Sequence, residues 1–472
     1  MAELRKISLD AKVVGALALG NWLLLVANHT VLQVSRDAPL WQLFPGGWGA
    51  VWMVACGLLA LAYPLRDQRW GPRFTGRDRA IHLAVIVVVF VVVPTIAEIV
   101  LRATGKPYTY IHDGAIMVEE AARALLAGRD PYSIDYLSTP LFYWPMINNP
   151  ALYHFTYFPG LFLVTAPFVA VFDRLGLFFD ERYLYLPAYI AACAMAPLLI
   201  PGGKTSYRLS LVAIVALDPQ LFPFVAEGRN DFFLLAFLFA GIALLQRERP
   251  TLGVLMIAIA ASAKLHAALL LPFLAAYLIW RAGPGSARRA VAAMTRASWP
   301  GAALIALVFV PFLAWDLGGF LDDVVAYNAG GAAWSYPISG MGFSAILRGV
   351  GVISYPQQDF PFWAFQIAAG TLIAGVSLRR LRSDPSVATL LASYAATLLA
   401  FLFFGRYFQG NYLGYIVAVA APVPFLRPDL VAAAVARVHG RVAPATTLRP
   451  VSGPSVIVPV ALTSDVGESP AE

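Results

Sequence analysis

The chain has 472 residues, of which 59% are hydrophobic and 13% are charged, with a formal net charge of +7. Soluble domains carry roughly 25% charged residues, so an ordinary soluble protein is excluded. The apolar residues fall in runs near the ~20 residues that cross a bilayer as a helix, whereas a membrane β-barrel would show short alternating segments. The basic residues lie in short loops between these runs, which argues against nucleic-acid binding and predicts an all-α, polytopic membrane protein.

The arginine-rich loop at residues 66–79 orients the first three apolar runs. These runs cover about residues 13–33, 48–64 and 80–101, and the loop between the second and the third is the most basic stretch of the chain. Because short cytoplasmic loops are enriched in Lys and Arg, this loop and the N-terminus are predicted to face the cytoplasm. The third run then leads outward, and residues 102–157, called segment I below, are expected on the non-cytoplasmic face.

Two later apolar runs are interrupted by polar residues. The run at about 206–226 is broken at Asp218 and Pro219, and the run at 251–281 turns near Lys264. Both interruptions are needed to keep the basic loops on one side of the membrane. Broken helices are tolerated at membrane depth only where they line a cavity or are covered by protein, so both breaks indicate a nearby site.

The remaining runs complete a bundle of about 12–14 predicted transmembrane helices. They lie at about 158–173, 183–200, 231–246, 297–315, 361–378, 387–404 and 411–426. A second outer segment, residues 316–360, is called segment II below and is rich in glycine and aromatic residues. The two cysteines, Cys56 and Cys193, fall inside apolar runs and are interpreted as packing residues. Residues 427–472 form a predicted cytoplasmic tail.

Segment I combines an acid with a short amphipathic helix. The pattern predicts a helix over residues 114–126 that lies along the membrane surface and stops at Gly128, with Glu119 and Arg123 as an i,i+4 pair. Asp113 directly precedes this helix and has two compatible interpretations. It can cap the helix N-terminus, or it can act as a general base at the membrane face.

Polar side chains from five regions are predicted to gather at the depth of Asp113. Ionisable groups are expensive there and are functional candidates. Lys and Arg could hold a phosphodiester while Asp113 deprotonates an acceptor hydroxyl, which is the chemistry of transfer from a lipid-phosphate sugar. The predicted donor-binding residues are Lys264, His266, Arg229, Asn230, Arg406, Tyr407, Asn411 and Tyr412. The predicted acceptor-binding residues are Glu119, Glu120, Tyr157, Trp334 and Tyr336.

Several of these residues also have simpler interpretations. Lys264 can be a snorkelling lysine at a helix end. Arg406 and the aromatic residues Trp334 and Tyr336 can be interfacial anchors, and Glu119 can belong to a surface ion pair. No second acid forms a clear pair with Asp113, so we expect neither a metal ion nor another cofactor.

Four motifs occur in order within residues 80–280. The first is Asp113 followed by Ala121-Ala122-Arg123-Ala124-Leu125-Leu126-Ala127-Gly128-Arg129-Asp130-Pro131-Tyr132. The others are Thr156-Tyr157-Phe158-Pro159-Gly160, Asp218-Pro219 with Gly228-Arg229-Asn230, and Ala261-Ser262-Ala263-Lys264. Together they resemble the motifs of family 87 glycosyltransferases of the GT-C superfamily. Arg229 stands where the family usually has Gln, and Leu265 stands where it usually has Pro.

The resemblance implies a transferase that depends on a polyprenyl-phosphate sugar, with Asp113 as the catalytic base and Lys264 as a contact of the donor phosphate. It also implies a division of the chain. A hairpin and basic loop (1–79) would precede a GT-C-like catalytic module (80–281), which C-terminal helices (282–426) would follow.

We therefore expect an inverting glycosyltransferase of the plasma membrane with its active site on the outer face and both termini in the cytoplasm. It would move a monosaccharide, mannose or arabinose, from a polyprenyl phosphate to an extracytoplasmic glycan, lipid or protein. One alternative is a lipid or sugar transporter or flippase, which would favour internal repeats and charges near the bilayer midplane. Another is a protein that binds a lipid-linked sugar without transferring it.

Overall fold

Helices dominate the part of the chain that the computed structural model describes, which is residues 7–27, 48–146, 149–282 and 286–429. Strand within these ranges is confined to one short parallel pair, β1 (Ser339–Gly340) with β2 (Tyr407–Phe408). The all-α prediction is thus confirmed. A compact unit ends at Arg427, and all but the first residues of the predicted tail lie outside the described ranges.

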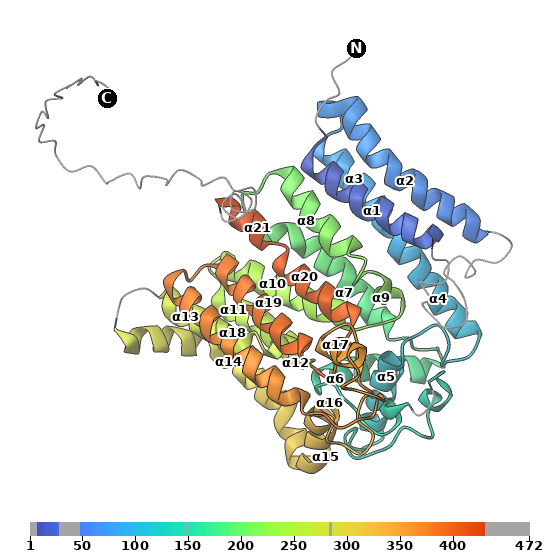
Figure 1. Ribbon diagram of the computed structural model, residues 1–472. Helices are drawn as coiled ribbons and strands as arrows, with labels where there is room; N and C mark the ends of the chain where they lie inside the picture. Colours follow the sequence, from blue (N-terminus) through green and yellow to red (C-terminus); the bar gives the residue numbers. More distant parts are fainter. Residues whose placement is uncertain (1–6, 28–47, 147–148, 283–285, 430–472) are drawn as a thin grey trace, which may run out of the picture. The chain divides into compact units, whose positions relative to one another are not determined.

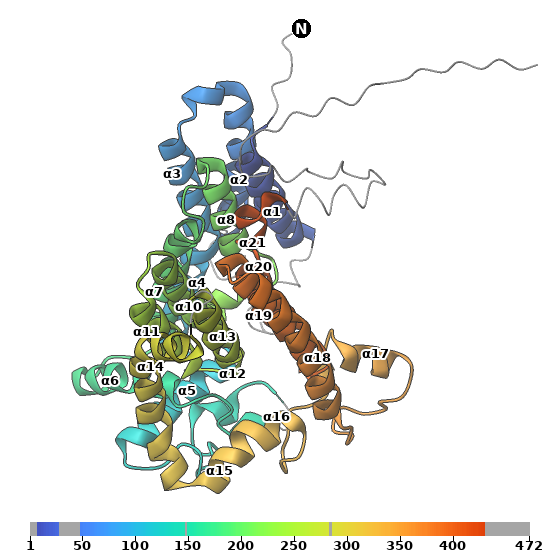
Figure 2. The same ribbon diagram turned by 90° about the vertical axis from the view of Figure 1, so that its left-hand side faces the viewer.

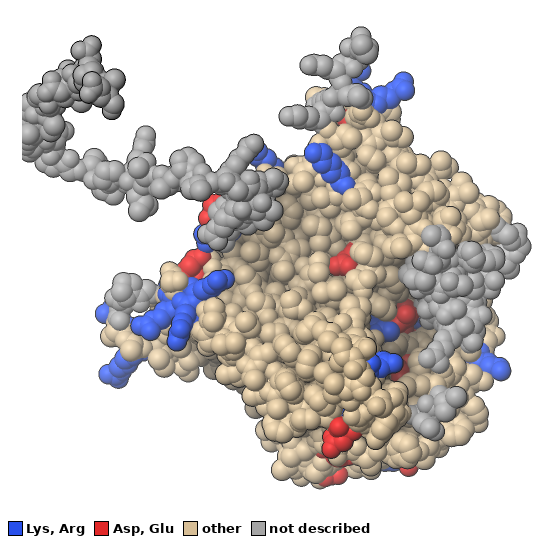
Figure 3. All heavy atoms as spheres, viewed as in Figure 1, with Lys and Arg blue, Asp and Glu red and all other residues tan. Residues whose placement is uncertain are grey.

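Five helical stretches among the described residues are long and apolar enough to cross a membrane. They are α1 (Leu9–Ala27), α2 (Trp48–Trp70), the continuous stretch of α3 (Gly76–Val87), η4 (Val88–Val92) and α4 (Val93–Thr104), α14 (Ala287–Trp315) and α18 (Phe362–Ser383). They expose large apolar side chains such as Leu307 and Leu372, and the face in Figure 3 carries few charges. Apolar surface of this extent fits contact with lipid, so the chain is an integral membrane protein.

Shorter helices make up most of the rest of the bundle. They are α6 (Gly160–Leu175), α7 (Arg182–Met195), α8 (Thr205–Leu217), α10 (Asp231–Gln246), α11 (Pro250–Ala261), α13 (Leu271–Arg281), α19 (Val387–Phe403) and α20 (Gly410–Ala420). The most buried is α10, which packs between α7 and α11 (Figure 1). Fewer helices reach the ~20 residues of a full crossing than the sequence suggested, because polar turns divide several apolar runs.

Both predicted breaks are present. The first runs from the end of α8 through the one-turn α9 (Pro223–Ala226) to Gly228, whose φ of +78° suits a residue without a side chain. The second follows α11, where Lys264 is extended (φ −160°) before the one-turn α12 (Leu265–Ala268). Helices α10 and α11 pack against each other as an antiparallel pair, so the start of α10 lies beside the end of α11. Lys264 therefore lies beside Asp231, and their side chains form an ion pair of 3.0 Å.

Segment I differs from its prediction in the setting of its helix. Helix α5 (Asp113–Leu126) begins at Asp113, and the N-cap is His112, whose Nδ1 lies 3.0 Å from the Gly114 nitrogen. The expected surface helix is instead largely buried, because α5 packs against α6. The expected i,i+4 pair is also wrong, since Arg123 binds Glu120 at 2.7 Å.

Segment II covers segment I. It contains α15 (Leu317–Leu321), η8 (Asp322–Ala326), α16 (Tyr327–Ala329) and α17 (Phe343–Gly349). Asp323 joins the two segments, because its carboxylate lies 2.7 Å from His154 Nδ1 and accepts the Phe155 N–H at 2.8 Å. Both views show α5, α15 and α16 at the end of the bundle remote from α2 and α3 (Figures 1 and 2).

Candidate active site

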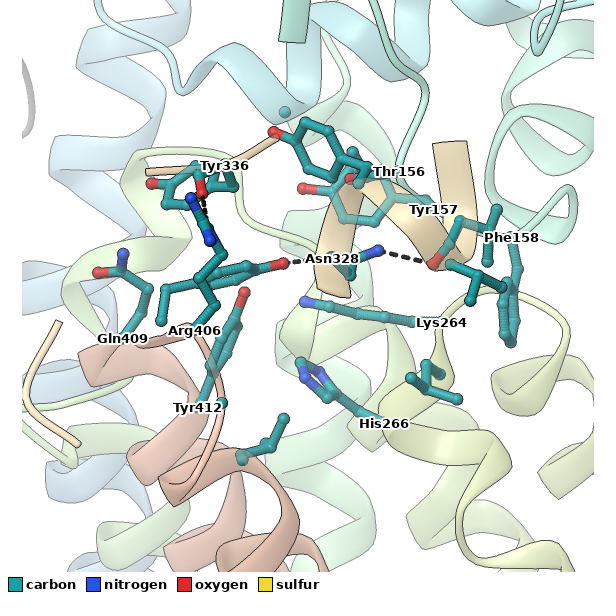
Figure 4. Close-up of a pocket in the computed structure, with 18 of the residues that line it drawn as sticks. Thr156, Tyr157, Phe158, Lys264, His266, Asn328, Tyr336, Arg406, Gln409 and Tyr412 are labelled. Carbon is teal, nitrogen blue, oxygen red and sulfur yellow. Dashed lines mark hydrogen bonds between the residues drawn. The ribbon is translucent and has the colours of Figure 1, made fainter. Parts of the chain in front are cut away.

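A cavity of about 490 Å³ lies where segments I and II meet the two helix breaks. Its polar wall comes from segment I, the breaks and the start of α20, and Figure 4 shows Lys264, His266 and Tyr412 converging on its middle. Its apolar wall comes from α14, α15, η8, α18 and α19. That wall includes Phe309, Phe320, Val325, Trp363, Ile367 and Phe401.

Asp113 contributes a carboxylate with one engaged and one available oxygen. Its Oδ1 accepts the Gly114 N–H at 2.7 Å and lies 2.8 Å from His112 Nδ1. Its Oδ2 has only a long contact of 3.4 Å with Asn149 Nδ2. Burial raises the pKa of Asp113, but His112, the Gly114 N–H and the charge of Arg229 outweigh it, so the pKa falls below its usual value. Asp113 is therefore ionised at neutral pH, and Oδ2 can accept a proton.

The turn that leads into Asp113 is strained and firmly held. Tyr110 has a φ of +57°, a left-handed conformation that costs a non-glycine residue ~1–3 kcal/mol. Its carbonyl accepts a hydrogen bond from Arg182 Nη1 at 2.7 Å. The next carbonyl, of Ile111, accepts one from Trp144 Nε1 at 2.9 Å. These contacts fix the position of the Asp113 carboxylate.

Arg182 also ties this turn to the first helix break. The same Nη1 donates to the Ala226 carbonyl at 2.7 Å, three residues before Arg229. A backbone bond of 2.8 Å from the His112 N–H to the Glu227 carbonyl adds a second link. One fully buried guanidinium therefore sets the relative position of the segments that carry Asp113 and Arg229.

Arg182 belongs to a buried ion network behind the cavity. The ion network consists of Glu98, Arg102, Glu119, Asp180 and Arg182, each at most 2% exposed. Arg102 binds both Glu119 oxygens at 2.7 Å, and Asp180 at 2.9 Å. Burial raises the pKa of Asp180, but the two arginines outweigh it, so the pKa lies below its ordinary value. These groups are paired with one another and do not line the cavity.

Lys264 presents an ammonium group to the cavity. Its Nζ donates to Asn230 Oδ1 at 2.9 Å and to Asp231 Oδ1 at 3.0 Å. The second Asp231 oxygen accepts a bond of 2.7 Å from Asn411 Nδ2. An ammonium has three donor hydrogens, so one remains for a ligand. A phosphate oxygen is a suitable partner for it.

Arg229 offers a second cation. Its Nε donates to Glu227 Oε2 at 2.7 Å, its Nη1 donates to Asn411 Oδ1 at 3.0 Å, and the guanidinium lies over the Phe224 ring. Within the described part of the chain, Nη2 has no hydrogen-bond partner. This nitrogen leaves a donor for an anionic ligand.

All eight predicted donor-binding residues line this single cavity. His266 packs edge-on against Tyr412, with ring centroids 4.6 Å apart. Arg406 also lines the cavity, but its Nε donates to the Tyr336 carbonyl at 2.5 Å, which fastens segment II. The Tyr407 hydroxyl donates to Asn328 Oδ1.

Two of the five predicted acceptor-binding residues line the cavity, and three do not. Tyr157 and Tyr336 line the cavity. Trp334 lies outside the lining and stacks on Tyr153, with ring centroids 5.1 Å apart. Glu119 belongs to the ion network, and Glu120 is paired with Arg123, so neither carboxylate reaches the cavity.

Several polar lining residues were not assigned a role from the sequence. Some had a signal: His112 directly precedes Asp113, Asp231 directly follows Asn230 at the start of an apolar run, and Gln409 lies between Tyr407 and Asn411. Asn328 in segment II had none, because only the folding of distant segments brings it to the cavity.

One group of side chains among the described residues has the composition of a metal site. His154, Asp322 and Asp323 hold possible ligand atoms within 4.8 Å of one another. The Asp323 oxygens already contact His154 Nδ1 and the Phe155 N–H, and none of the three residues lines the cavity. We therefore interpret this group as the fastening between segments I and II.

Residues 155–405, just over half of the chain, match the family model of Glycosyltransferase family 87. The matched range contains both helix breaks and segment II, whereas Asp113 precedes it. The comparison with curated proteins finds no match.

Proposed function

This chain belongs to glycosyltransferase family 87, and we propose that it takes a monosaccharide from a polyprenyl phosphate. The sugar is mannose or arabinose, and the acceptor is a hydroxyl of an extracytoplasmic glycan, lipid or protein. Transfer proceeds with inversion at the anomeric carbon. The proposed reaction uses no cofactor.

The observation that carries the proposal is the composition of the single cavity. The carboxylate of Asp113 shares it with the cations of Lys264 and Arg229, which suits a sugar phosphate. Its other wall is apolar and comes in part from α14 and α18, two helices of membrane-spanning length. Trp363 and Ile367 of α18 are both more than half exposed. A substrate with a charged head and a long hydrocarbon tail satisfies both walls.

The reaction follows from these positions. Asp113 Oδ2 accepts the proton of the acceptor hydroxyl as the oxygen attacks the anomeric carbon. The bond from that carbon to the phosphate oxygen breaks, and the polyprenyl phosphate leaves with the electron pair. Lys264 and Arg229 stabilise the charge that grows on the phosphate. Because Asp113 activates the acceptor and forms no bond to the sugar, one displacement inverts the anomeric centre.

The membrane orientation is part of the proposal. Segments I and II lie at the end of the bundle remote from the basic loop at 66–79 (Figure 2). If that loop faces the cytoplasm, as its arginines favour, the cavity is at the outer face. The catalytic module then comprises residues 80–281, with the C-terminal helices supplying segment II and the Arg406 region.

The test is a transfer assay with the purified full chain in detergent. Radiolabelled polyprenyl-phosphate mannose and arabinose are compared with the corresponding nucleotide sugars, each with a panel of mannoside and arabinoside acceptors. We expect product from at least one polyprenyl phosphate and none from a nucleotide sugar. Turnover of nucleotide sugars would overturn the donor assignment. Lipid flux in proteoliposomes with no transfer would favour a flippase instead.

A further inference from the structure

We infer that a groove between α2 and α3 binds an anionic phospholipid of the leaflet on the side of the basic loop. The site is independent of the proposed transfer reaction, because α2 and α3 lie at the opposite end of the bundle from α5, α15 and α16, which contribute to the cavity (Figure 2). The groove has a volume of about 270 Å³. Its lining residues are Leu59, Ala62, Arg66, Asp78, Ile81, His82 and Val85.

The polar mouth of the groove contains an oriented arginine. Arg66 Nη1 lies 3.2 Å from His82 Nδ1, and the guanidinium stacks between Trp70 and Phe74, at 4.7 and 4.8 Å from their ring centroids. The other His82 nitrogen, Nε2, lies 3.2 Å from the Leu59 carbonyl, which can only accept a hydrogen bond. Nε2 is therefore the protonated nitrogen, and Nδ1 accepts from Arg66.

This arginine has unused bonding capacity. Among the described residues no carboxylate lies within ion-pair distance of Arg66, and its buried Nε has no hydrogen-bond partner. The neighbouring Arg79 differs, because it is paired with Asp10 and Asp67. Asp78 also lines the groove, but its carboxylate accepts from the Thr75 backbone and hydroxyl at 3.1 and 2.7 Å in a capping box.

The groove changes from polar to apolar along the helices. Leu59 and Ala62 precede Arg66 on α2 by two turns and one turn, so the apolar part reaches about 10 Å along the helix from the Arg66 backbone, at ~1.5 Å per residue. Val85 and Ile81 line the same depth on α3 and are more than 40% exposed. A phosphate at Arg66 with an acyl chain beside Leu59 matches this order, and basic pockets between membrane helices are known anionic-lipid sites.

The surrounding loop adds charge of the same sign. Arg69, Arg73 and Arg77 are exposed, line no part of the groove and have no ion pair within the described ranges. Such charges attract an anionic membrane surface as a whole, whereas a basic residue close to an anionic headgroup contributes ~1 kcal/mol, a factor of about five in affinity. Charge complementarity thus favours phosphatidylglycerol or another anionic lipid over a zwitterionic one.

The test measures lipid retained by the full chain in neutral detergent, by native mass spectrometry. The assay has three arms: phosphatidylglycerol alone, phosphatidylcholine alone, and phosphatidylglycerol with excess inorganic phosphate. We expect selective retention of phosphatidylglycerol without displacement by phosphate. Arg66→Gln should lower retention about fivefold, whereas the charge-matched Arg73→Gln should change it by less than about twofold.

A second variant keeps the test decisive if Arg66→Gln does not fold. Ala62→Phe fills the apolar part of the groove and leaves Arg66 intact, and it should lower retention as much. Equal losses from Arg66→Gln and Arg73→Gln would show unspecific attraction and overturn the site. The site would also be overturned if both groove variants retained as much lipid as the wild type, or if inorganic phosphate alone displaced the lipid.

Discussion

The ion network and the charged residues of the cavity (Asp113, Arg229 and Lys264, called the cavity group) both lie inside the bundle, yet they differ in what their atoms contact. In the ion network, Arg182 donates to Asp180, Glu98 and two backbone carbonyls, and Arg102 to two carboxylates. In the cavity group, Asp113 Oδ2 has only a long contact, and Lys264 keeps a donor hydrogen.

The difference separates a positioning role from a binding role. Burial of charge by itself does not distinguish the two, since Asp113 is only 7% exposed and the ion-network residues are at most 2% exposed. Unused bonding capacity that faces a cavity does distinguish them, because a ligand can satisfy it. The ion network supports the cavity group by holding the Tyr110 turn through Arg182. The next four experiments test this division.

The largest effect on turnover is expected from Asp113→Asn. The amide keeps the size of the side chain and loses the base, so turnover should fall about 10²- to 10⁴-fold. Thermal stability and donor binding should stay near those of the wild type. Initial rates and thermal unfolding in detergent measure both. An Asp113→Asn protein that retains most of its activity would contradict the base assignment.

Arg182→Gln should act on stability first. It leaves Asp180 and Glu98 without their buried partner, and breaking such a pair costs ~3–5 kcal/mol. Thermal or chaotrope unfolding would measure the loss. Arg182→Lys keeps the charge but not the bidentate bond or both carbonyl contacts. It should therefore regain part of the stability while turnover stays low at unchanged donor KM. Full recovery of turnover in Arg182→Lys would argue against positioning.

Lys264→Gln should weaken donor binding. A hydrogen bond to a charged group contributes ~1.5–3 kcal/mol, so the donor KM should rise about 10- to 100-fold. The control is Lys204→Gln, which removes the same charge beside Tyr207, away from the cavity. Kinetics at varied donor concentration would separate KM from turnover. An unchanged KM would remove Lys264 from the donor site.

The smallest effect is expected from His112→Gln, as a shift of the pH profile. The base form of Asp113 is lost as pH falls through its pKa, which His112 helps to lower. The kcat/KM of the wild type should therefore stay constant as the pH is lowered, down to a pH below 3.8, the ordinary pKa of an aspartate. Without His112, less opposes the effect of burial, which raises the pKa of Asp113. The acid limb of the pH profile should therefore move to higher pH. An unmoved limb would show that His112 does not tune Asp113.

The sequence by itself determined the membrane class, both helix breaks and the chain positions of the predicted donor-binding residues. These features depend on local properties: apolar runs of helical length, proline and glycine at turns, and arginines in short loops. A polar residue at a break in an apolar run must be covered or face a cavity wherever the chain folds. This is why Lys264 and Arg229 could be named in advance.

The tertiary structure alone decided which polar groups serve the cavity and which serve the scaffold. Glu119 has the same local pattern as a surface acid, and Arg182 lies at the start of an apolar run, yet both are buried in the ion network. The Tyr110 turn is held by Arg182, 72 residues away in sequence. Such a contact depends on how α4, α5 and α7 pack, and packing between distant segments is not specified by the spacing of residues in any one of them.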